Sequence, residues 1–161
     1  MSGKQSSTFN PLTSTIGLKV AMAVSGVLLA LFVLQHMAGN LQVFLGREEY
    51  NEYAHFMQSL GEIKWAARLG LLGLLALHVG SAVMLVQRNR EARPNAYQAD
   101  RKNKASSAAG RSMALSGLVI LFFVIYHLLH FTVGAVHADC FGMVDPNGHH
   151  DVYNNFVHSL S

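Results

Sequence analysis

Charged side chains are scarce in this sequence. Asp, Glu, Lys and Arg make up 13% of its 161 residues, about half the share that is usual in soluble domains, whereas 51% of the residues are hydrophobic. Three runs, 20–46, 69–87 and 112–138, contain none of these four residue types, and each reaches the ~20 residues of a bilayer-spanning helix. The sequence therefore predicts an all-α integral membrane helical bundle with three spanning helices. The first run is also as apolar as a signal-peptide core, but a long tail precedes it and no small-x-small cleavage pair ends it.

Cysteine is nearly absent, since Cys140 is the only one in the chain. This excludes an intrachain disulfide and a cysteine metal site. The basic segment 88–111 also lacks aromatic residues between its charges, apart from Tyr97, so it does not have the stacking pattern of a nucleic-acid-binding surface. The expected partner of this chain is therefore the lipid bilayer, and no nucleic acid is expected.

Basic residues are missing from one end of the chain. No Lys or Arg follows Val136, whereas seven lie between positions 88 and 111: Arg88, Arg90, Arg93, Arg101, Lys102, Lys104 and Arg111. Because basic residues collect on the cytoplasmic side of a membrane, this segment and the N-terminus are predicted to be cytoplasmic. We expect a single membrane domain, 1–161, made of a cytoplasmic tail (1–15), spans at 16–44, 65–87 and 112–138, a cytoplasmic loop (88–111), and outer segments at 45–64 and 139–161.

Two pairs of segments repeat each other. SGVLLALFVLQH (25–36) and SGLVILFFVIYH (116–127) both read Ser-Gly, nine residues and His, and YNEYAH (50–55) matches YNNFVH (153–158). In the first repeat, His78 follows 23 residues after the last position of YNEYAH. Its counterpart in the second repeat would lie about twenty positions beyond the last residue. We therefore expect the second repeat to be incomplete in this sequence.

Three histidines lie inside the predicted spans. An ionisable side chain in a bilayer is costly and indicates a functional site. His36 lies 17 residues beyond Lys19, and His127 lies 16 residues beyond Arg111, so helical rise places both roughly 25 Å above the cytoplasmic edge. His78 is ten residues from its own cytoplasmic edge, roughly 15 Å up. The sequence predicts one histidine pair at an outer level and a single histidine at an inner level.

Two neutral imidazoles at one depth are what bis-histidine haem ligation requires, since they approach the iron from opposite faces of the macrocycle. Ser25 and Ser116 each lie eleven residues before their histidine, near the same helical face, and a small residue there leaves room for a porphyrin. Ser-Gly pairs alternatively serve close helix packing. Zinc is disfavoured because its sites need three or four ligands, and no Cys or carboxylate lies in the spans.

The remaining histidines have other readings. His130 lies one turn beyond His127 on nearly the same face, but the repeat favours His127 because His130 aligns with Gly39. Five lie outside the spans and are expected at the surface or at interfaces, namely His55, His137, His149, His150 and His158. His55 is also a candidate for proton transfer.

Three segments carry a resemblance to a known family: VLQHMAGNLQVF (33–44), LALHVGSAVMLVQRNREARP (75–94) and SGLVILFFVIYHLLH (116–130). With them the chain resembles, over nearly all of its length, the cytochrome b subunit of succinate dehydrogenase and fumarate reductase, in the five-helix, di-haem class. The resemblance implies a bacterial cytoplasmic membrane protein that anchors flavoprotein and iron-sulfur subunits. It also implies electron transfer to or from a quinone, often menaquinone, through two b-type haems.

The resemblance implies His36 and His127 as ligands of the outer haem and His78 as a ligand of the inner haem. The family has further helices, one of which bears the fourth ligand, and this sequence does not contain them. Four residues near the outer end of the first span are candidates for moving quinone protons, or are simply solvated: Glu48, Tyr50, Glu52 and Tyr53. Arg68 pairs with a haem propionate or extends to the lipid headgroups.

Two other functions remain open on the sequence. One is a cytochrome b subunit of another respiratory enzyme, such as a hydrogenase or a formate dehydrogenase. The other is a haem-free helical anchor or small transport subunit, whose histidines bind protons or a substrate. The chain itself is not expected to act on succinate.

Overall fold

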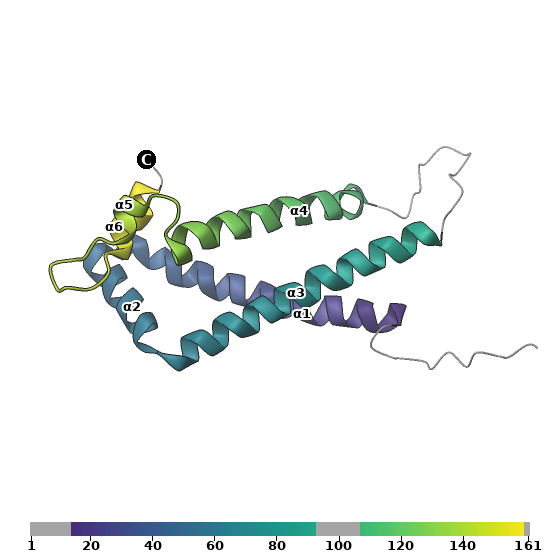
Figure 1. Ribbon diagram of the computed structural model, residues 1–161, viewed down its shortest axis with the longest axis horizontal. Coiled ribbons are helices and arrows are strands. Elements are labelled where there is room, and N and C mark those ends of the chain that lie inside the picture. Colours follow the sequence, from purple (N-terminus) through teal and green to yellow (C-terminus); the bar gives the residue numbers. More distant parts are fainter. Residues whose placement is uncertain (1–13, 93–106, 160–161) are drawn as a thin grey trace, which may run out of the picture. The chain divides into compact units, whose positions relative to one another are not determined.

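The computed structural model describes residues 14–92 and 107–159, and every regular element in them is helical. Within these residues no strand forms, apart from one isolated bridge between Val144 and His150. The predicted all-α class is confirmed. Most of the predicted cytoplasmic tail and most of the predicted cytoplasmic loop lie outside the described residues. The helices, labelled in Figure 1, are α1 (Thr15–Asn40), α2 (Arg47–Ser59), α3 (Glu62–Glu91), α4 (Ala108–Leu128), α5 (Ala138–Phe141) and α6 (Val152–His158).

Three helical segments are long and apolar enough to cross a membrane, namely Thr15–Leu45, Glu62–Glu91 and Ser112–Val133. The first joins α1 to a 3₁₀ turn (Leu41–Leu45), and the third joins α4 to a π-helical turn (Leu129–Val133). Large apolar side chains on them face outward, as lipid-facing residues do in a membrane protein. The chain is thus a multi-pass membrane protein with three helical spans, as predicted.

Serine side chains cap the N-termini of α1 and α4, the helices that contain the first and third spans. The Ser14 hydroxyl accepts a hydrogen bond from the backbone N–H of Gly17 at 3.0 Å, and Ser107 does the same for Gly110 at 3.0 Å. Each bond satisfies one of the N–H groups that have no partner within the first turn of a helix. Both helices therefore start at residues that the sequence marks as caps.

The third span ends at Val133, five residues before the boundary expected at position 138. Gly134 follows it with a left-handed backbone (φ 73°), and the ring of Phe141 occupies the place that a Cβ at this glycine would need. A residue with a side chain is therefore disfavoured at Gly134 both by its backbone and by its surroundings. The turn that stops the helix is built on this glycine.

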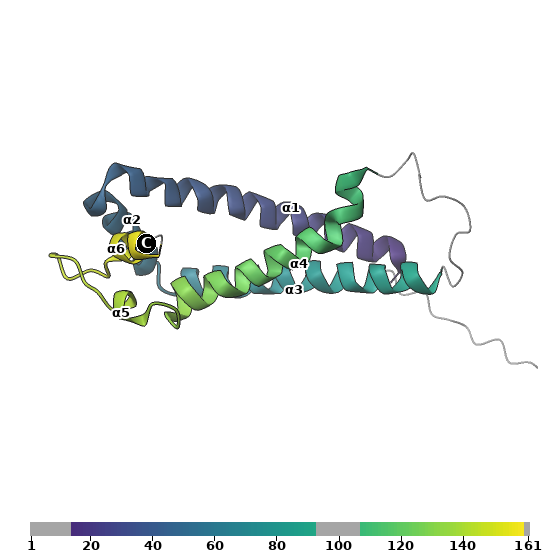
Figure 2. The ribbon, with the colours of Figure 1, turned by 90° about the horizontal axis from the view of Figure 1, so that it is seen from above.

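The helices form two units, which are described separately. The first contains α1 and α3, and the second contains α2, α4, α5 and α6. In the first unit α1 packs against α3 (Figure 1, Figure 2). The buried residues on these helices include two small ones, Ser25 and Ser81, and two leucines, Leu18 and Leu85. Small residues let membrane helices approach each other closely.

In the second unit α6 packs against α2 and α5. α2 lies within the predicted outer segment 45–64, and it buries Tyr50 and Asn51 while Glu48 and Glu52 remain exposed. Glu48 and Glu49 lie in its first turn, where the helix dipole favours negative charge. α2 and α6 contain the two copies of the Tyr-Asn motif, YNEYAH and YNNFVH, and the fold brings these copies into contact.

Candidate functional site

His78 is the spanning histidine whose surroundings are best defined. It lies on α3, and its ring is directed at α1. The Nδ1 atom lies 3.0 Å from the carbonyl oxygen of Met22 and 3.3 Å from the hydroxyl oxygen of Ser25. Ser25 has no exposed surface (0%), so water does not compete for its hydroxyl. One face of α1 therefore holds this imidazole by a single ring nitrogen.

The contact with Met22 fixes which nitrogen carries the proton. A carbonyl oxygen only accepts hydrogen bonds, so Nδ1 of His78 is the donor. The Ser25 hydroxyl donates to the carbonyl of Ala21 at 2.6 Å, and its oxygen is left as a second acceptor for the same N–H. In a neutral imidazole with a protonated Nδ1, the other nitrogen, Nε2, has a free lone pair. Within residues 14–92 and 107–159, Nε2 of His78 has no hydrogen-bond partner.

Gly26 also contributes to the surface of α1 that the His78 ring contacts. A Cβ on this glycine would lie 3.0 Å from Cε1 and 3.3 Å from Nδ1 of His78. Such separations are tighter than ordinary van der Waals contact, so a side chain here would force the ring to shift by a few tenths of an ångström. The glycine of the Ser-Gly pair therefore allows the imidazole to reach the backbone of α1.

Ser25 thus serves a different histidine from the one expected. The sequence placed it on the face of His36, and helical phase supports that. His36 is eleven residues further along α1, however, which is about 16 Å at 1.5 Å per residue. The two residues share a face but not a level, and the level of Ser25 is that of His78. Within the first unit, His36 and His78 therefore lie at different positions along α1.

Ser116 and Gly117 occupy the same positions in the second repeat, and no histidine among the described residues of the second unit contacts them. The exposed Ser116 hydroxyl donates only to backbone carbonyls of its own helix, those of Ser112 and Met113, each at 3.1 Å. Among the described residues, nothing lies within 4 Å of the place of a Cβ at Gly117. The two Ser-Gly pairs therefore match in sequence and differ in what they contact.

His36 and His127 have one local feature in common. Each ring stacks on a phenylalanine four residues earlier in its helix, Phe32 at 5.4 Å between centroids and Phe123 at 5.8 Å. Both phenylalanines stand at the same place in the two repeated frames. His36 belongs to the first unit and His127 to the second. The sequence analysis did not single out these phenylalanines, although their equal position in the repeat was a visible signal.

His130 is almost completely buried, at 2% exposure, and its Nε2 atom has no partner among the described residues. The ring stacks on Phe131 at 4.2 Å and lies 5.3 Å from the ring of His137. It stands in the π-helical turn at the end of the third span. Such turns occur frequently at functional sites. Burial of His130 rather than His127 is not readable from the repeat.

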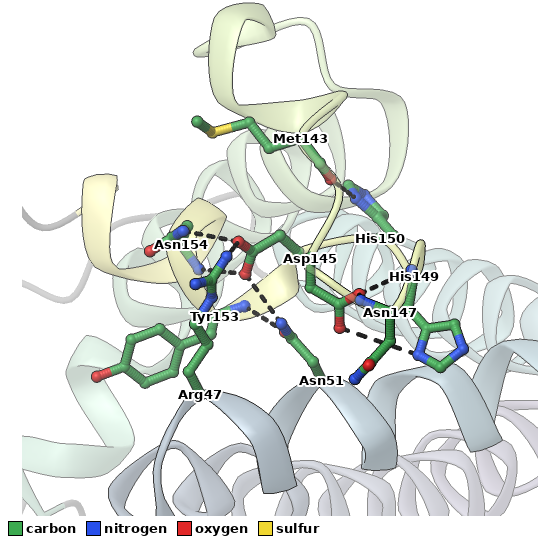
Figure 3. A network of polar contacts seen from close by, with 10 residues as sticks. Arg47, Asn51, Met143, Asp145, Asn147, His149, His150, Tyr153 and Asn154 are labelled. Atoms are coloured by element: carbon green, nitrogen blue, oxygen red, sulfur yellow. Dashed lines mark hydrogen bonds and ion pairs between the residues drawn. The ribbon is translucent and has the colours of Figure 1, made fainter.

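A buried carboxylate, Asp151, connects α2 to α6, and Figure 3 labels its partners Arg47, Asn51 and Asn154. It is 1% exposed and forms an ion pair with Arg47 at 2.6 Å. It also accepts hydrogen bonds from the side chains of Asn51 at 3.0 Å and Asn154 at 2.6 Å. Burial alone would raise the pKa of Asp151, but the hydrogen bonds from Arg47, from the Asn51 side chain and from the backbone N–H of Asn154 outweigh it and lower the pKa to about 2. This network ties α2 to α6, and the sequence analysis did not anticipate it.

His149 lies beside this network and faces His55. Their rings are stacked 3.7 Å apart, and Asp145 lies 3.9 Å from Nδ1 of His149. Asp145 uses its other oxygen to accept the backbone N–H groups of Asn147 and His149 (Figure 3). The candidate proton carrier His55 thus has an imidazole and a nearby carboxylate as neighbours, and it lies outside the spans.

The residues proposed for quinone protons divide by exposure. Glu48 and Glu52 are exposed, whereas Tyr50 is 5% exposed and its pKa is raised by burial and, to a lesser extent, by Tyr53. Arg68 holds its guanidinium over the ring of Trp65 at 5.1 Å near the start of α3. This cation–π contact is typical of the interfacial ends of spanning helices.

Among the described residues, no group of three or more His, Cys, Asp or Glu side chains is placed to hold a metal ion. A site with several protein ligands, such as zinc requires, is therefore not formed by these residues. Comparison of the chain with protein-family models, with curated proteins and with solved structures finds no match.

Proposed function

We propose that this chain is the haem b-binding membrane anchor of a succinate:quinone oxidoreductase in a bacterial cytoplasmic membrane. In this role it connects an iron-sulfur subunit and its flavoprotein partner to a membrane quinone, with menaquinone as the expected species. The observation that carries the proposal is the geometry of His78. A spanning helix presents an imidazole whose Nδ1 is bonded to a backbone carbonyl and whose Nε2 has no hydrogen-bond partner among the described residues.

This donor chemistry fits haem. A histidine that ligates a metal almost always donates its other ring N–H to a carbonyl, a carboxylate or water. Haem needs only one or two protein ligands, so it does not require the clusters that are missing from the described residues. The repeated frames add His36 and His127, each stacked on its own phenylalanine. When bound, b-type haem would supply one-electron transfer across the membrane.

The chain's own residues would have three tasks. His36 and His127 would hold one haem at the outer level, and His78 would supply a ligand at the inner level. The apolar spans would exclude water from both levels. The α2–α6 pair would keep the outer segments together through the Asp151 network.

A haem-free anchor is the second candidate, and the same atom supports it. A free Nε2 on His78 would then accept a proton instead of binding iron. A cytochrome b subunit of a hydrogenase or a formate dehydrogenase is the third. The second candidate predicts no haem spectrum, whereas the third predicts a b-type haem that hydrogen or formate reduces and succinate does not.

The test is a dithionite-minus-oxidised visible spectrum of the chain purified in detergent, with haem quantified per chain. His36→Ala and His127→Ala are compared with His158→Ala, a control at an exposed histidine outside the spans. We expect a b-type spectrum that the first two variants lose and the control keeps. A chain without haem contradicts the proposal and favours the haem-free anchor. Reduction of the haem by succinate, and not by hydrogen or formate, in membranes would separate the first candidate from the third.

A further inference from the structure

We infer that Ser25, Gly26 and the carbonyl group of Met22 form a positioning site for His78, which holds its ring with Nδ1 protonated and Nε2 as the nitrogen that binds. The assignment of the ring form stands on the geometry of the first unit. Its consequence for haem rests on the proposed function.

The first step is the direction of the hydrogen bond. Nδ1 of His78 lies 3.0 Å from the Met22 oxygen and 3.3 Å from the Ser25 oxygen, so one N–H is shared between two acceptors. The alternative ring form, with the proton on Nε2, would set a nitrogen lone pair against the carbonyl lone pairs of Met22. That arrangement leaves two buried acceptors facing each other, which costs free energy in an apolar environment.

The second step is the orientation of Ser25. Its hydroxyl hydrogen is directed to the carbonyl of Ala21 at 2.6 Å, within its own helix. A serine hydroxyl that donates in this way keeps its lone pairs for an outside donor. Ser25 is fully buried, so His78 is the donor that it meets. The Ser25 hydroxyl oxygen therefore accepts a hydrogen bond from Nδ1 of His78 and does not donate a proton to it.

The third step is the fit at Gly26. Because a Cβ would lie 3.0 Å from Cε1 of His78, a residue larger than glycine must displace the ring. Displacement lengthens the contact with Met22 and frees the ring to change its form. Gly26 thus determines how closely the ring can approach, while Met22 and Ser25 determine which nitrogen carries the proton.

The consequence for a bound metal follows from ligand basicity. A hydrogen bond from Nδ1 makes Nε2 a stronger donor to iron and stabilises the oxidised state. Loss of such a partner typically weakens metal binding by about 10-fold or more. Ser25 is therefore a positioning residue, acting on iron only through His78.

The second repeat supplies matched controls. Ser116 and Gly117 stand in the same Ser-Gly frame on a spanning helix, but among the described residues no histidine contacts them. A substitution there changes helix propensity and apolar surface as it would in the first repeat. Such a substitution does not change the residues that contact His78, namely Met22, Ser25 and Gly26.

The direct test is ¹⁵N NMR of the haem-free chain in detergent with ring-labelled histidine, in which His78→Gln identifies the His78 signals. We expect a protonated Nδ1 and an unprotonated Nε2 at neutral pH. Gly26→Val should convert these signals to an averaged or reversed pattern, and Gly117→Val should leave them unchanged. Ser25→Ala should shift the Nδ1 signal, and Ser25→Thr, which keeps the hydroxyl, should restore it. A native His78 with its proton on Nε2, or freely exchanging, overturns the inference.

A second measurement separates this inference from the proposed function. In chain loaded with haem, Ser25→Ala is expected to raise the midpoint potential of the haem whose spectrum depends on His78, with about a 10-fold loss of affinity. Ser25→Thr should match the unsubstituted chain. If the chain binds no haem but shows the expected ring form, the proposed function fails and the positioning site stands. If haem binds while the potential is the same in Ser25→Ala, the positioning role toward haem is wrong.

Discussion

Asn51 donates a hydrogen bond to the carboxylate of Asp151 at 3.0 Å, although 100 residues separate the two in the sequence. Asn154 donates to the same carboxylate at 2.6 Å. These two asparagines occupy the same place in the motifs YNEYAH and YNNFVH. One buried carboxylate therefore receives the equivalent amide from each copy of the repeat. The repetition in the sequence corresponds to a physical pairing of α2 with α6.

Replacement of Asp151 by Asn should loosen this pairing. The variant loses the ion pair with Arg47 and turns one acceptor oxygen into a donor that faces the amides of Asn51 and Asn154. Because Asp151 is 1% exposed, its donors lose a buried partner, and we expect a loss of about 1–3 kcal/mol in local stability. Hydrogen exchange of the α6 amides, followed by mass spectrometry in detergent, measures this loss as faster exchange.

Glu52→Gln is the matched control for this prediction. Glu52 is an exposed carboxylate on α2, one residue beyond Asn51, and the same chemical change there should leave the α6 amides unaffected. Equal exchange in Asp151→Asn and the unsubstituted chain would show that the network does not hold α6 in place.

Acid should release the same contact in a defined pH range. The pKa of Asp151 is lowered from 3.8 to about 2, so the folded state favours the ionised form more than the unfolded state does. The resulting stability, about 2 kcal/mol at most, is complete above pH 3.8 and is lost as the pH falls through about 2. We expect protection of the α6 amides to fall over this range in the native chain. Asp151→Asn should show no such step, and a step of equal size in both chains would assign it to another group.

The fold class could be predicted because it depends on composition. Uncharged runs of sufficient length leave few alternatives to spanning helices, and the three expected spans are present. Start signals were also local, since Ser14 and Ser107 cap the helices that follow them. The end of the third span was missed because the helix stops at the left-handed backbone of Gly134, where the ring of Phe141, seven residues later, leaves no room for a side chain. Such a contact depends on the turn geometry and not on the apolar run.

For the histidines, too, the features set within one helix could be predicted and those set by contacts between helices could not. Helical rise gives the order of the two levels along α1, but the contact of His78 with Ser25 sets their separation at about 16 Å, larger than the roughly 10 Å expected from the sequence. The partner of Ser25 could not be counted, because it depends on how α3 packs against α1. Burial of His130 in a π-helical turn, and the pairing of Asp151 with Arg47, also arise from tertiary contacts. Pattern within one helix fixes a face and a depth, while contacts between helices decide what each side chain meets.

Gly134→Ala should destabilise the turn after the third span. The new Cβ would collide with the ring of Phe141, and the left-handed backbone is unfavourable for alanine by about 1 kcal/mol before that collision is counted. We expect a lower unfolding temperature in detergent. Gly142→Ala is the control, because its φ is −92° and nothing among the described residues lies within 4 Å of the new Cβ. Equal melting of the two variants would contradict the role given to Gly134.

His130→Phe tests the choice between the two neighbouring histidines of the third span. The Nε2 atom of His130 is buried without a partner among the described residues, so a phenyl ring of similar shape removes a polar atom that gains nothing there. We expect a stability change below about 1 kcal/mol and an unchanged haem spectrum. His127→Phe is expected to lose the outer haem, since only His127 has a counterpart in the repeat.

The reverse pattern has an equally definite meaning. Loss of haem in His130→Phe, with a normal spectrum in His127→Phe, would make the buried Nε2 of His130 the ligand atom and its missing partner the iron. The π-helical turn would then orient the side chain of His130 toward the iron, one helical turn beyond His127, the position that the repeat predicts. Thermal unfolding of both variants, measured without haem, shows whether a lost spectrum reflects a lost ligand or a lost fold.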